Sequence, residues 1–242
     1  MIEARWLGHS TFLFTLSSGE RVLIDPFLAG NPVTPQAWKD PGKIDFILLT
    51  HAHDDHAADT LALAAKTGAA VVSIVELSGL LKADGLPAEQ ALEMNKGGTL
   101  DLGPLKVTMT HAQHSSSWKG EYAGEPAGFI LHTETLRIYH AGDTNIMSDF
   151  ELYGKLYRPH VALLPIGDHY TMGPEEAALA CRMLQAPVAI PMHYGTMPVL
   201  SGTPKAFEQL TKEATDGTTR IVVPEPGEDF LPQVERLLPA VP

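Results

Sequence analysis

The stretch His51-Ala52-His53-Asp54-Asp55-His56 concentrates three imidazoles and two carboxylates in six residues. It directly follows residues 44–50 (IDFILLT), an apolar run that is short, continuous and partly β-branched or aromatic, as buried parallel strands are. Residues 57–66 then form a stretch rich in strong helix formers. The order of strand, polar loop and helix puts the cluster at the carboxyl end of a strand, where open α/β sheets bind ligands.

The spacing of these side chains predicts two metal ions. His51 and His53 are two residues apart, so an extended backbone directs both side chains to one side, where they can bind one ion together. Asp55 and His56 lie where the helix begins and diverge from the first pair, so they can reach a second ion. Imidazole and carboxylate are ligands of zinc and similar divalent ions. The alternative is a solvated loop that is rich in histidine by chance.

The composition describes an ordinary globular chain. Its 242 residues fit a single α/β domain over 1–242, with 44% hydrophobic and 19% charged residues. No apolar run reaches about 18 residues, so no membrane span is expected. The single cysteine, Cys181, lies in a helical pattern and is expected to be a small buried hydrophobe. With no disulfide and no signal-peptide pattern, the predicted compartment is the cytoplasm.

The charge balance narrows the partners. The formal net charge is −12, and no basic run or stripe occurs along the chain. Nucleic acids are bound through lysine and arginine contacts to phosphates, so they are disfavoured as partners. We therefore expect a small-molecule substrate. The sequence does not decide the oligomeric state, and a homo-oligomer is one option.

Short apolar segments alternate with helical patterns along the chain. We predict strands at 1–14 (a pair broken at Gly8-His9-Ser10), 21–26, 44–50, 70–75, 98–102, 105–110, 127–133, 136–140, 160–165, 187–192 and 220–223. We predict helices at 57–66, 77–85, 145–157, from Gly173-Pro174 onward and at 203–214, followed by a proline-rich tail. The strand–loop–helix order recurs in both halves, so two sheets are expected to pack together with helices outside.

The pattern H-x-H-x-D-H after an apolar strand resembles the metallo-β-lactamase superfamily, and the likeness extends from Trp6 to about Pro224. It is similar to that superfamily's branch of uncharacterised metal-dependent hydrolases. This branch in turn resembles ascorbate-6-phosphate lactonases and the phospholipase D that acts on N-acyl-phosphatidylethanolamine. The resemblance implies an α/β fold arranged as a four-layer αββα sandwich.

The resemblance also assigns roles to residues beyond the first cluster. Asp143 lies in Gly142-Asp143-Thr144 after an apolar strand, where the residues alone favour a helix or turn cap. The superfamily's G-D-T at this point implies a ligand that bridges both ions. His193 closes another apolar strand and matches the last ligand of the family pattern.

Two histidines compete for the remaining ligand position. Strand alternation sends His111 and His114 to opposite faces, so one of them is expected to meet the ions. The resemblance places the ligand in the His-Ser-Ser element and so favours His114, with His111 as the alternative. His132, His140 and His160 are interpreted as ordinary strand histidines.

Three further residues are predicted to support the site or to touch substrate. Asp25 ends the strand before the metal loop, and His9 lies in a Gly-His-Ser turn, so both are candidates to orient ligands. His169, in a loop after an apolar strand, is a candidate for substrate contact. Loops 27–43, with Trp38, and 115–126, with Trp118, are placed to shape the pocket.

Together these residues predict hydrolysis by two ions and a bridging hydroxide, since metal coordination brings the pKa of water to about 7. Asp55 would pass a proton to the leaving group, and Asp143 would hold both ions.

The predicted substrate is a small ester, lactone or phosphodiester, preferably anionic. Zinc is the first choice of metal, with manganese or nickel as alternatives. The competing hypotheses are a non-catalytic metal-binding protein on the same fold and a nuclease. The predicted ligand sets are His51, His53 and His114 for one ion, and Asp55, His56 and His193 for the other, joined by Asp143.

Overall fold

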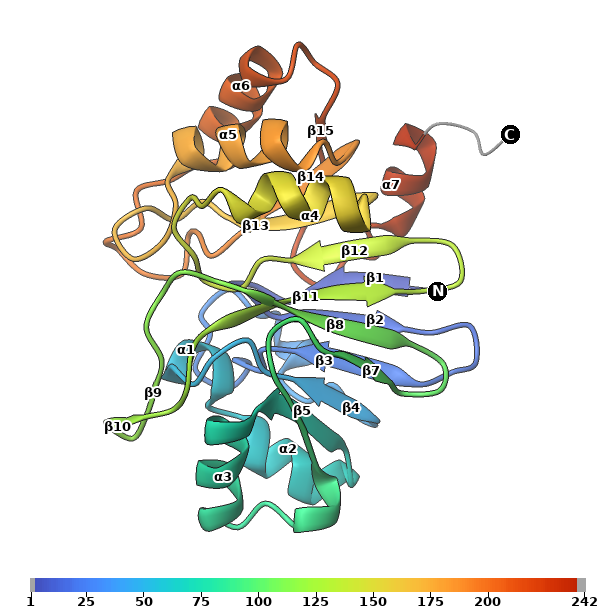
Figure 1. The fold of residues 1–242 in the computed structure, drawn as a ribbon, viewed down its shortest axis with the longest axis vertical. Coiled ribbons are helices and arrows are strands. Elements are labelled where there is room, and N and C mark those ends of the chain that lie inside the picture. The colour runs from blue at the N-terminus through green and yellow to red at the C-terminus, as the bar shows by residue number, and fades with distance from the viewer. Residues whose placement is uncertain (1–2, 239–242) are drawn as a thin grey trace.

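Two β-sheets pack face to face at the centre of the molecule, and helices cover their outer sides (Figure 1). The computed structural model describes residues 3–238. Phe12 of the first sheet meets His140 of the second, with their ring centroids 5.5 Å apart, so the sheets are in direct contact. This arrangement confirms the predicted α/β sandwich of four layers.

The first sheet has six strands in the order β1-β2-β3-β4-β5-β6. The first three are antiparallel neighbours, and β3 to β6 pair in parallel. Its strands are β1 (Glu3–Trp6), β2 (Phe12–Thr15), β3 (Arg21–Ile24), β4 (Phe46–Leu48), β5 (Ala70–Ile74) and β6 (Ala91–Met94).

The second sheet has seven strands in the order β15-β14-β13-β12-β11-β8-β7. Strands β12 to β15 pair in parallel, and every residue of β13 and β14 is buried, as expected for strands covered on both faces. Its strands are β7 (Thr99–Asp101), β8 (Lys106–His111), β11 (Ala127–His132), β12 (Arg137–His140), β13 (Val161–Pro165), β14 (Val188–Met192) and β15 (Arg220–Ile221). A small separate hairpin joins β9 (Ser117–Trp118) to β10 (Glu121–Tyr122).

The helices divide between the two sheets. Helices α2 and α3 contact the first sheet, and α5 and α6 contact the second. None of the helices in the described part of the chain is long and apolar enough to cross a membrane. The helices are α1 (Asp54–Ala57), α2 (Thr60–Thr67), α3 (Val75–Ala83), α4 (Asp149–Tyr157), α5 (Pro174–Leu184), α6 (Pro204–Ala214) and α7 (Leu231–Leu237), with 3₁₀ turns η1 (Gln36–Trp38) and η2 (Ala88–Gln90).

The helix predicted at 57–66 corresponds to α2, which begins three residues later than predicted, at Thr60. A separate short helix, α1, begins at Asp54, and residues 58–59 separate it from α2. The Asp59 carboxylate accepts hydrogen bonds from the backbone N–H groups of Leu28, at 2.6 Å, and Ala29, at 3.0 Å. Asp59 therefore ties the loop that follows β3 to the end of the metal-loop helix.

Other differences involve short elements. Strand β6, the β9–β10 hairpin and α7 were not predicted, and α4 begins at Asp149, four residues after its predicted start. Helix α7 forms in the predicted proline-rich tail because Pro232 lies in its first turn, where proline is tolerated, and Phe230 and Val234 are buried. The predicted start of the first strand at Met1 lies outside the described residues.

Candidate metal centre

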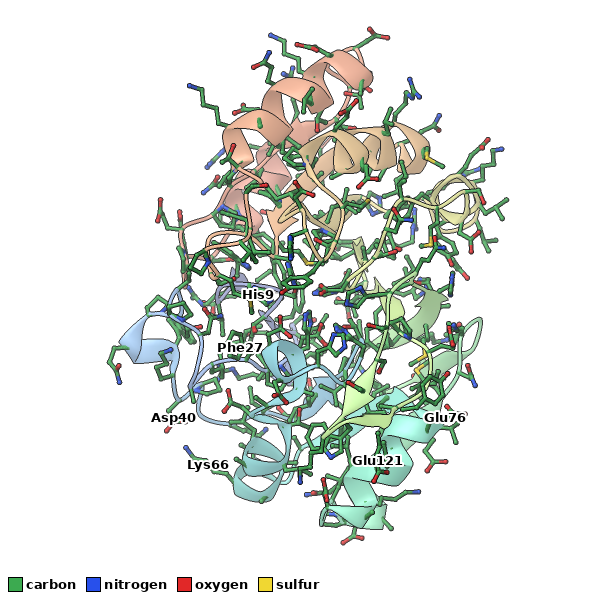
Figure 2. The ribbon with its side chains drawn as sticks, turned by 90° about the vertical axis from the view of Figure 1, so that its left-hand side faces the viewer. His9, Phe27, Asp40, Lys66, Glu76 and Glu121 are labelled. Atoms are coloured by element: carbon green, nitrogen blue, oxygen red, sulfur yellow. The ribbon has the colours of Figure 1, made fainter. Side chains whose placement is uncertain are left out.

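Most of the predicted site residues lie together at the carboxyl ends of the parallel strands. Figure 2 looks at this side, with His9 and Phe27 in the middle of the view between the helical layers. Each side chain follows a strand of one sheet or the other, so the fold assembles residues that are far apart in the sequence. Asp25 follows β3, His51 and His53 follow β4, His114 follows β8, Asp143 follows β12 and His193 follows β14.

Several of these residues have left-handed backbone conformations. The φ angles are 56° at His9, 48° at Asp25 and 57° at His193, a region that residues with a side chain seldom adopt. Gly142 also has a positive φ, of 65°, and a Cβ there would lie 2.3 Å from the carbonyl oxygen of Ala127. Such strain persists where the surroundings determine it, and it gathers at functional sites.

His51, His53 and His114 form the first group of ligand atoms, all within 4.8 Å of one another. Nε2 of His51 and Nδ1 of His53 are 3.0 Å apart. Burial lowers the pKa of all three imidazoles, so they are neutral and can offer lone pairs to a cation. This is the set predicted for the first ion. His111 lies outside it, with Nδ1 3.1 Å from Nζ of Lys96.

His9, Asp55, His56 and His193 form the second group, and His9 is the member that the predicted ligand set did not include. Nε2 of His9 lies 3.0 Å from Oδ2 of Asp55, and Nδ1 lies 2.6 Å from Oγ1 of Thr196. Burial and the neighbouring His193 lower the pKa of His9 to about 4. The ring is therefore neutral. Because both of its nitrogens already have protein partners, His9 is suited to hold Asp55 in place.

Asp143 joins the two groups. Its Oδ2 lies 2.9 Å from Nε2 of His193 and 3.3 Å from Nε2 of His56, both in the second group. The same oxygen lies 3.8 Å from Nε2 of His114, in the first group. Burial disfavours the carboxylate, yet His193 and His56 hold its pKa well below the usual range. Its buried Oδ1 has no hydrogen-bond partner among residues 3–238.

Asp25 and Thr50 hold two of the candidate ligands, His51 and His56, through hydrogen bonds. Asp25 accepts hydrogen bonds from the backbone N–H of Thr50, at 2.8 Å, and from its hydroxyl, at 2.6 Å. Oδ2 of Asp25 also lies 2.8 Å from Nδ1 of His56, and the Thr50 hydroxyl lies 3.0 Å from Nδ1 of His51. Both rings thus present Nε2 to the centre. Thr50 was not predicted to belong to the site. Its position between an apolar strand and His51 could have indicated this role.

The donor set fits divalent cations. Two ring nitrogens face each other, a buried carboxylate oxygen lacks a partner, and the carboxylates are surrounded by imidazoles. Burial opposes a charge on His56, but Asp143 and Asp25 hold its pKa well above the ordinary value. The carboxylates therefore require positive charge at this point, which a proton on His56 or a bound cation can supply.

A crevice of about 560 Å³ opens over the two groups. His169 does not line it, but the adjacent Tyr170 does. The two predicted loops contribute Phe27 and Ser115 to the wall. Their tryptophans are fixed elsewhere: Arg5 lies over the Trp38 ring, 5.1 Å from its centroid, and the indole N–H of Trp118 donates to Asp84.

Comparison with known proteins identifies the family of this chain. The model of the β-lactamase superfamily domain matches residues 20–194. The chain belongs to this superfamily. Relatives named UPF0173 metal-dependent hydrolase include one from Rubrobacter xylanophilus, 47% identical over 93% of this chain and 94% of its own length. Another, from Herpetosiphon aurantiacus, is 44% identical over 92% of this chain and 95% of its own length. The chain is thus a member of a family of metal-dependent hydrolases.

Solved structures extend the comparison to three dimensions. Igni18, described as a metallo hydrolase from Ignicoccus hospitalis, is 37% identical with a TM-score of 0.83, and the match covers 93% of this chain and 96% of Igni18. An isothiocyanate hydrolase from Delia radicum gut bacteria has a TM-score of 0.72 at 20% identity, over 94% of this chain and 98% of that protein. At that identity the second likeness concerns the fold alone.

Proposed function

We propose that this member of the superfamily hydrolyses a small ester, lactone or phosphodiester with two divalent ions. The observation that carries the proposal is the position of Asp143 Oδ2, within 3.8 Å of imidazole nitrogens from both ligand groups. His51, His53 and His114 would hold one ion, and Asp55, His56 and His193 the other. Zinc suits imidazole and carboxylate donors best, and manganese and nickel are the alternatives.

The bound ions would supply a hydroxide nucleophile at neutral pH and polarise the scissile carbonyl or phosphoryl group. The chain's own residues position these parts and move protons. Burial raises the pKa of Asp55, but the hydrogen bond from His9 and the nearby His56 together outweigh burial and hold this pKa below the usual range, so Asp55 is ionised at neutral pH. In our proposal Asp55 accepts a proton from the attacking water and returns it to the leaving group.

The residues that line the crevice indicate which charge the substrate carries. Phe27, Ala58, Tyr170 and Met197 give the wall an apolar character, and no lysine or arginine is among the lining residues that the structure describes. Only the ions would attract an anion in the crevice. The part of the substrate away from the ions would contact apolar side chains. This lining favours an uncharged ester or lactone over the anionic substrate expected from the sequence. The volume, about 560 Å³, suits a small molecule.

The two competing functions are less well supported. A nuclease needs basic side chains along its substrate path, and the described lining has none. A non-catalytic metal-binding protein has no need for an open apolar crevice over its ions. Both alternatives make distinct predictions for turnover.

The test is a turnover assay on zinc-loaded protein with uncharged aryl esters and lactones, aryl phosphodiesters and a structured RNA at equal concentration. We expect hydrolysis of an ester or lactone that a chelator abolishes and added zinc restores. An Asp143→Asn variant should be inactive, whereas Asp216→Asn, the same change at an exposed position, should match wild type. Metal-dependent RNA cleavage without small-ester turnover would overturn the proposal in favour of a nuclease. Metal binding without any turnover would favour the non-catalytic alternative.

A further inference from the structure

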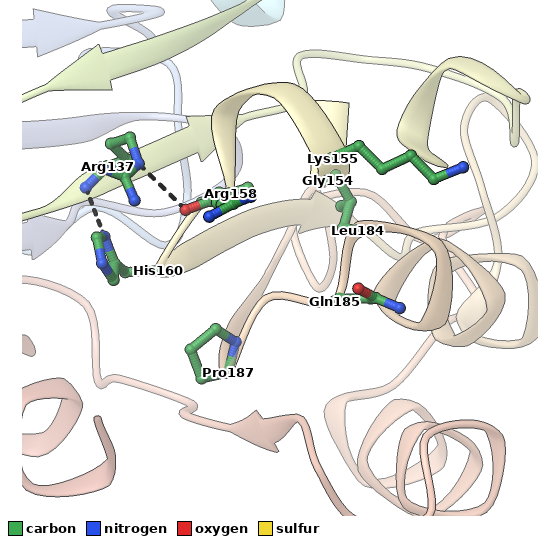
Figure 3. Close-up of a pocket in the computed structure, with 9 residues that line it drawn as sticks. Arg137, Gly154, Lys155, Arg158, His160, Leu184, Gln185 and Pro187 are labelled. Atoms are coloured by element: carbon green, nitrogen blue, oxygen red, sulfur yellow. Dashed lines mark hydrogen bonds between the residues drawn. The ribbon is translucent and has the colours of Figure 1, made fainter. Parts of the chain in front are cut away.

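A second cavity, of about 530 Å³, lies at the amino ends of strands in the second sheet, and Figure 3 shows the residues that line it. Its walls come from the amino ends of β12, β13 and β14 and from the carboxyl ends of α4 and α5. Its volume falls within the range of small-molecule sites, about 300–1,000 Å³. We call it the basic pocket, because Arg137, Lys155, Arg158 and His160 line it together with Gly154 and Gln185.

The charges of the basic pocket are unbalanced. Three cationic side chains and no carboxylate are among its described lining residues, although the chain carries a formal charge of −12. Lys155 is paired with Glu151, with 2.6 Å between Nζ and Oε1. Arg137 and Arg158 form no ion pair with any residue in 3–238. Nε of Arg137 donates to the carbonyl oxygen of Arg158 at 3.2 Å (Figure 3). The two terminal amino groups of Arg137 have no hydrogen-bond partner within residues 3–238, so they can bind a ligand.

His160 contributes a donor. Its Nδ1 accepts the backbone N–H of Arg137 at 2.9 Å, so the ring proton of the neutral imidazole is on Nε2 (Figure 3). Burial and the nearby Arg137 lower the pKa of His160, which keeps this neutral form at neutral pH. The pocket therefore combines two guanidinium groups with an imidazole N–H donor.

The two helix ends bring polar side chains to the basic pocket at a conformational cost. Arg158 and Gln185 are the C-cap residues of α4 and α5, with φ of 47° and 55°, where glycine is favoured. The two helices pack closely at Gly154. A Cβ at this position would lie 2.6 Å from the carbonyl oxygen of Leu184. Both caps thus border one cavity, and each carries a polar side chain where glycine would relieve the backbone.

Basic residues at helix carboxyl ends also have a structural explanation, since they neutralise the partial negative charge of the last carbonyl groups. That role requires charge near the helix ends. It does not require a cavity, or a second arginine at the start of β12. A structural role and a binding role predict different results for an Arg158→Gly variant, because glycine relieves the strained backbone while it removes the guanidinium group.

We propose that the basic pocket is a second binding site, for a small molecule that carries a phosphate group. Planar guanidinium groups bind phosphate oxygens through paired N–H donors, and two arginines with an imidazole N–H offer enough donors for a tetrahedral anion. The pocket is larger than a phosphate ion needs, so the ligand extends along the walls of the cavity beyond the arginines.

The experiment is an amide NMR titration of zinc-loaded protein with phenyl phosphate. We expect saturable shifts at Gly154 and Gln185, separate from any shifts at Gly142 and Gly195 beside the metal centre. Arg158→Gly and Arg137→Gln should each weaken the binding reported by Gly154 and Gln185 by about tenfold or more, the value of one charged hydrogen bond. Lys212→Gln, which removes an exposed cation on α6, should bind as wild type does.

Several results would overturn the proposal. Absence of shifts at Gly154 and Gln185 up to about 10 mM ligand would leave less affinity than a small-molecule site has. Unchanged affinity in Arg158→Gly would assign the arginine to the helix end alone, and the melting temperature of the variant, expected to be equal or higher, verifies folding. Benzoate binding as tightly as phenyl phosphate would exclude the phosphate class.

Discussion

Strands β12, β13 and β14 connect two sites of opposite character. At their carboxyl ends Asp143 and His193 of the candidate metal centre are buried, 2% and 1% exposed. At their amino ends the basic pocket is open, and Arg158 and Lys155 are exposed. Burial makes each charge at the metal centre depend on its neighbours, whereas water screens the charges of the pocket. Substitutions should therefore have large effects at one end of the strands and small effects at the other.

The largest effect is expected for Asp143→Asn. This change removes the carboxylate charge that both ligand groups share, so we expect loss of one ion per chain. Activity should fall by more than the roughly 100-fold that loss of a supporting residue costs. Elemental analysis and ester turnover measure the two effects, with Asp216→Asn as the control. A variant that keeps two ions and near-normal turnover would refute the bridging role of Asp143.

Asp25→Asn should have the next largest effect. Asparagine keeps the shape of Asp25 and tolerates its φ of 48°, but it loses the charge that orients His56 and Thr50. We expect metal affinity to fall about 10–100-fold, measured by competition with a chelator. Asp40→Asn, which alters an exposed pair with Lys66, should leave the affinity unchanged. Equal metal affinities in wild type, Asp25→Asn and Asp40→Asn would show that Asp25 does not support metal binding.

At the opposite edge, Arg158→Gly should change stability only slightly. The left-handed conformation costs an L-residue about 1–2 kcal/mol. Glycine avoids this cost but loses about 0.5–1 kcal/mol through backbone entropy, so the free energy of unfolding should stay equal or rise by up to about 1.5 kcal/mol. Denaturant unfolding measures it. Arg158→Ala, which keeps the strained φ, is the control and should be less stable than the glycine variant. The reverse order would mean that strain at Arg158 is not what separates the variants.

At neutral pH the ionisation of the buried Cys181 thiol has the smallest effect, because it changes stability only under alkaline conditions. Burial raises the pKa of Cys181, on α5, from 9.0 to about 12. Above pH 9 the unfolded thiol therefore ionises while the folded thiol remains neutral, so stability is lost as pH rises from 9 toward 12. The free energy of unfolding should fall less steeply over this range in Cys181→Ala than in wild type. Equal slopes would show that Cys181 has the same pKa in both states.

Much of the metal centre could be predicted from the sequence. The ligand types, their spacing and their place after an apolar strand are local features, so they predicted His51, His53, Asp55 and His56 as ligands. The roles of Asp143 and His193 were implied only by the family resemblance. His114 was favoured over His111 by the family resemblance, and the structure brings His114 to the first group. The supporting position of Asp25 followed from the strand that precedes the metal loop.

The sequence by itself determined the alternation of strands and helices and the chemistry of the ligands, because periodicity and residue type are local. Only the tertiary structure decided the contacts between distant segments: His9 against Asp55 and Thr196, Thr50 between Asp25 and His51, and Tyr170 in place of His169 at the crevice. It also decided the basic pocket, whose arginines lie in separate elements. These contacts depend on how two sheets and the ends of two helices pack, which no single stretch of sequence records.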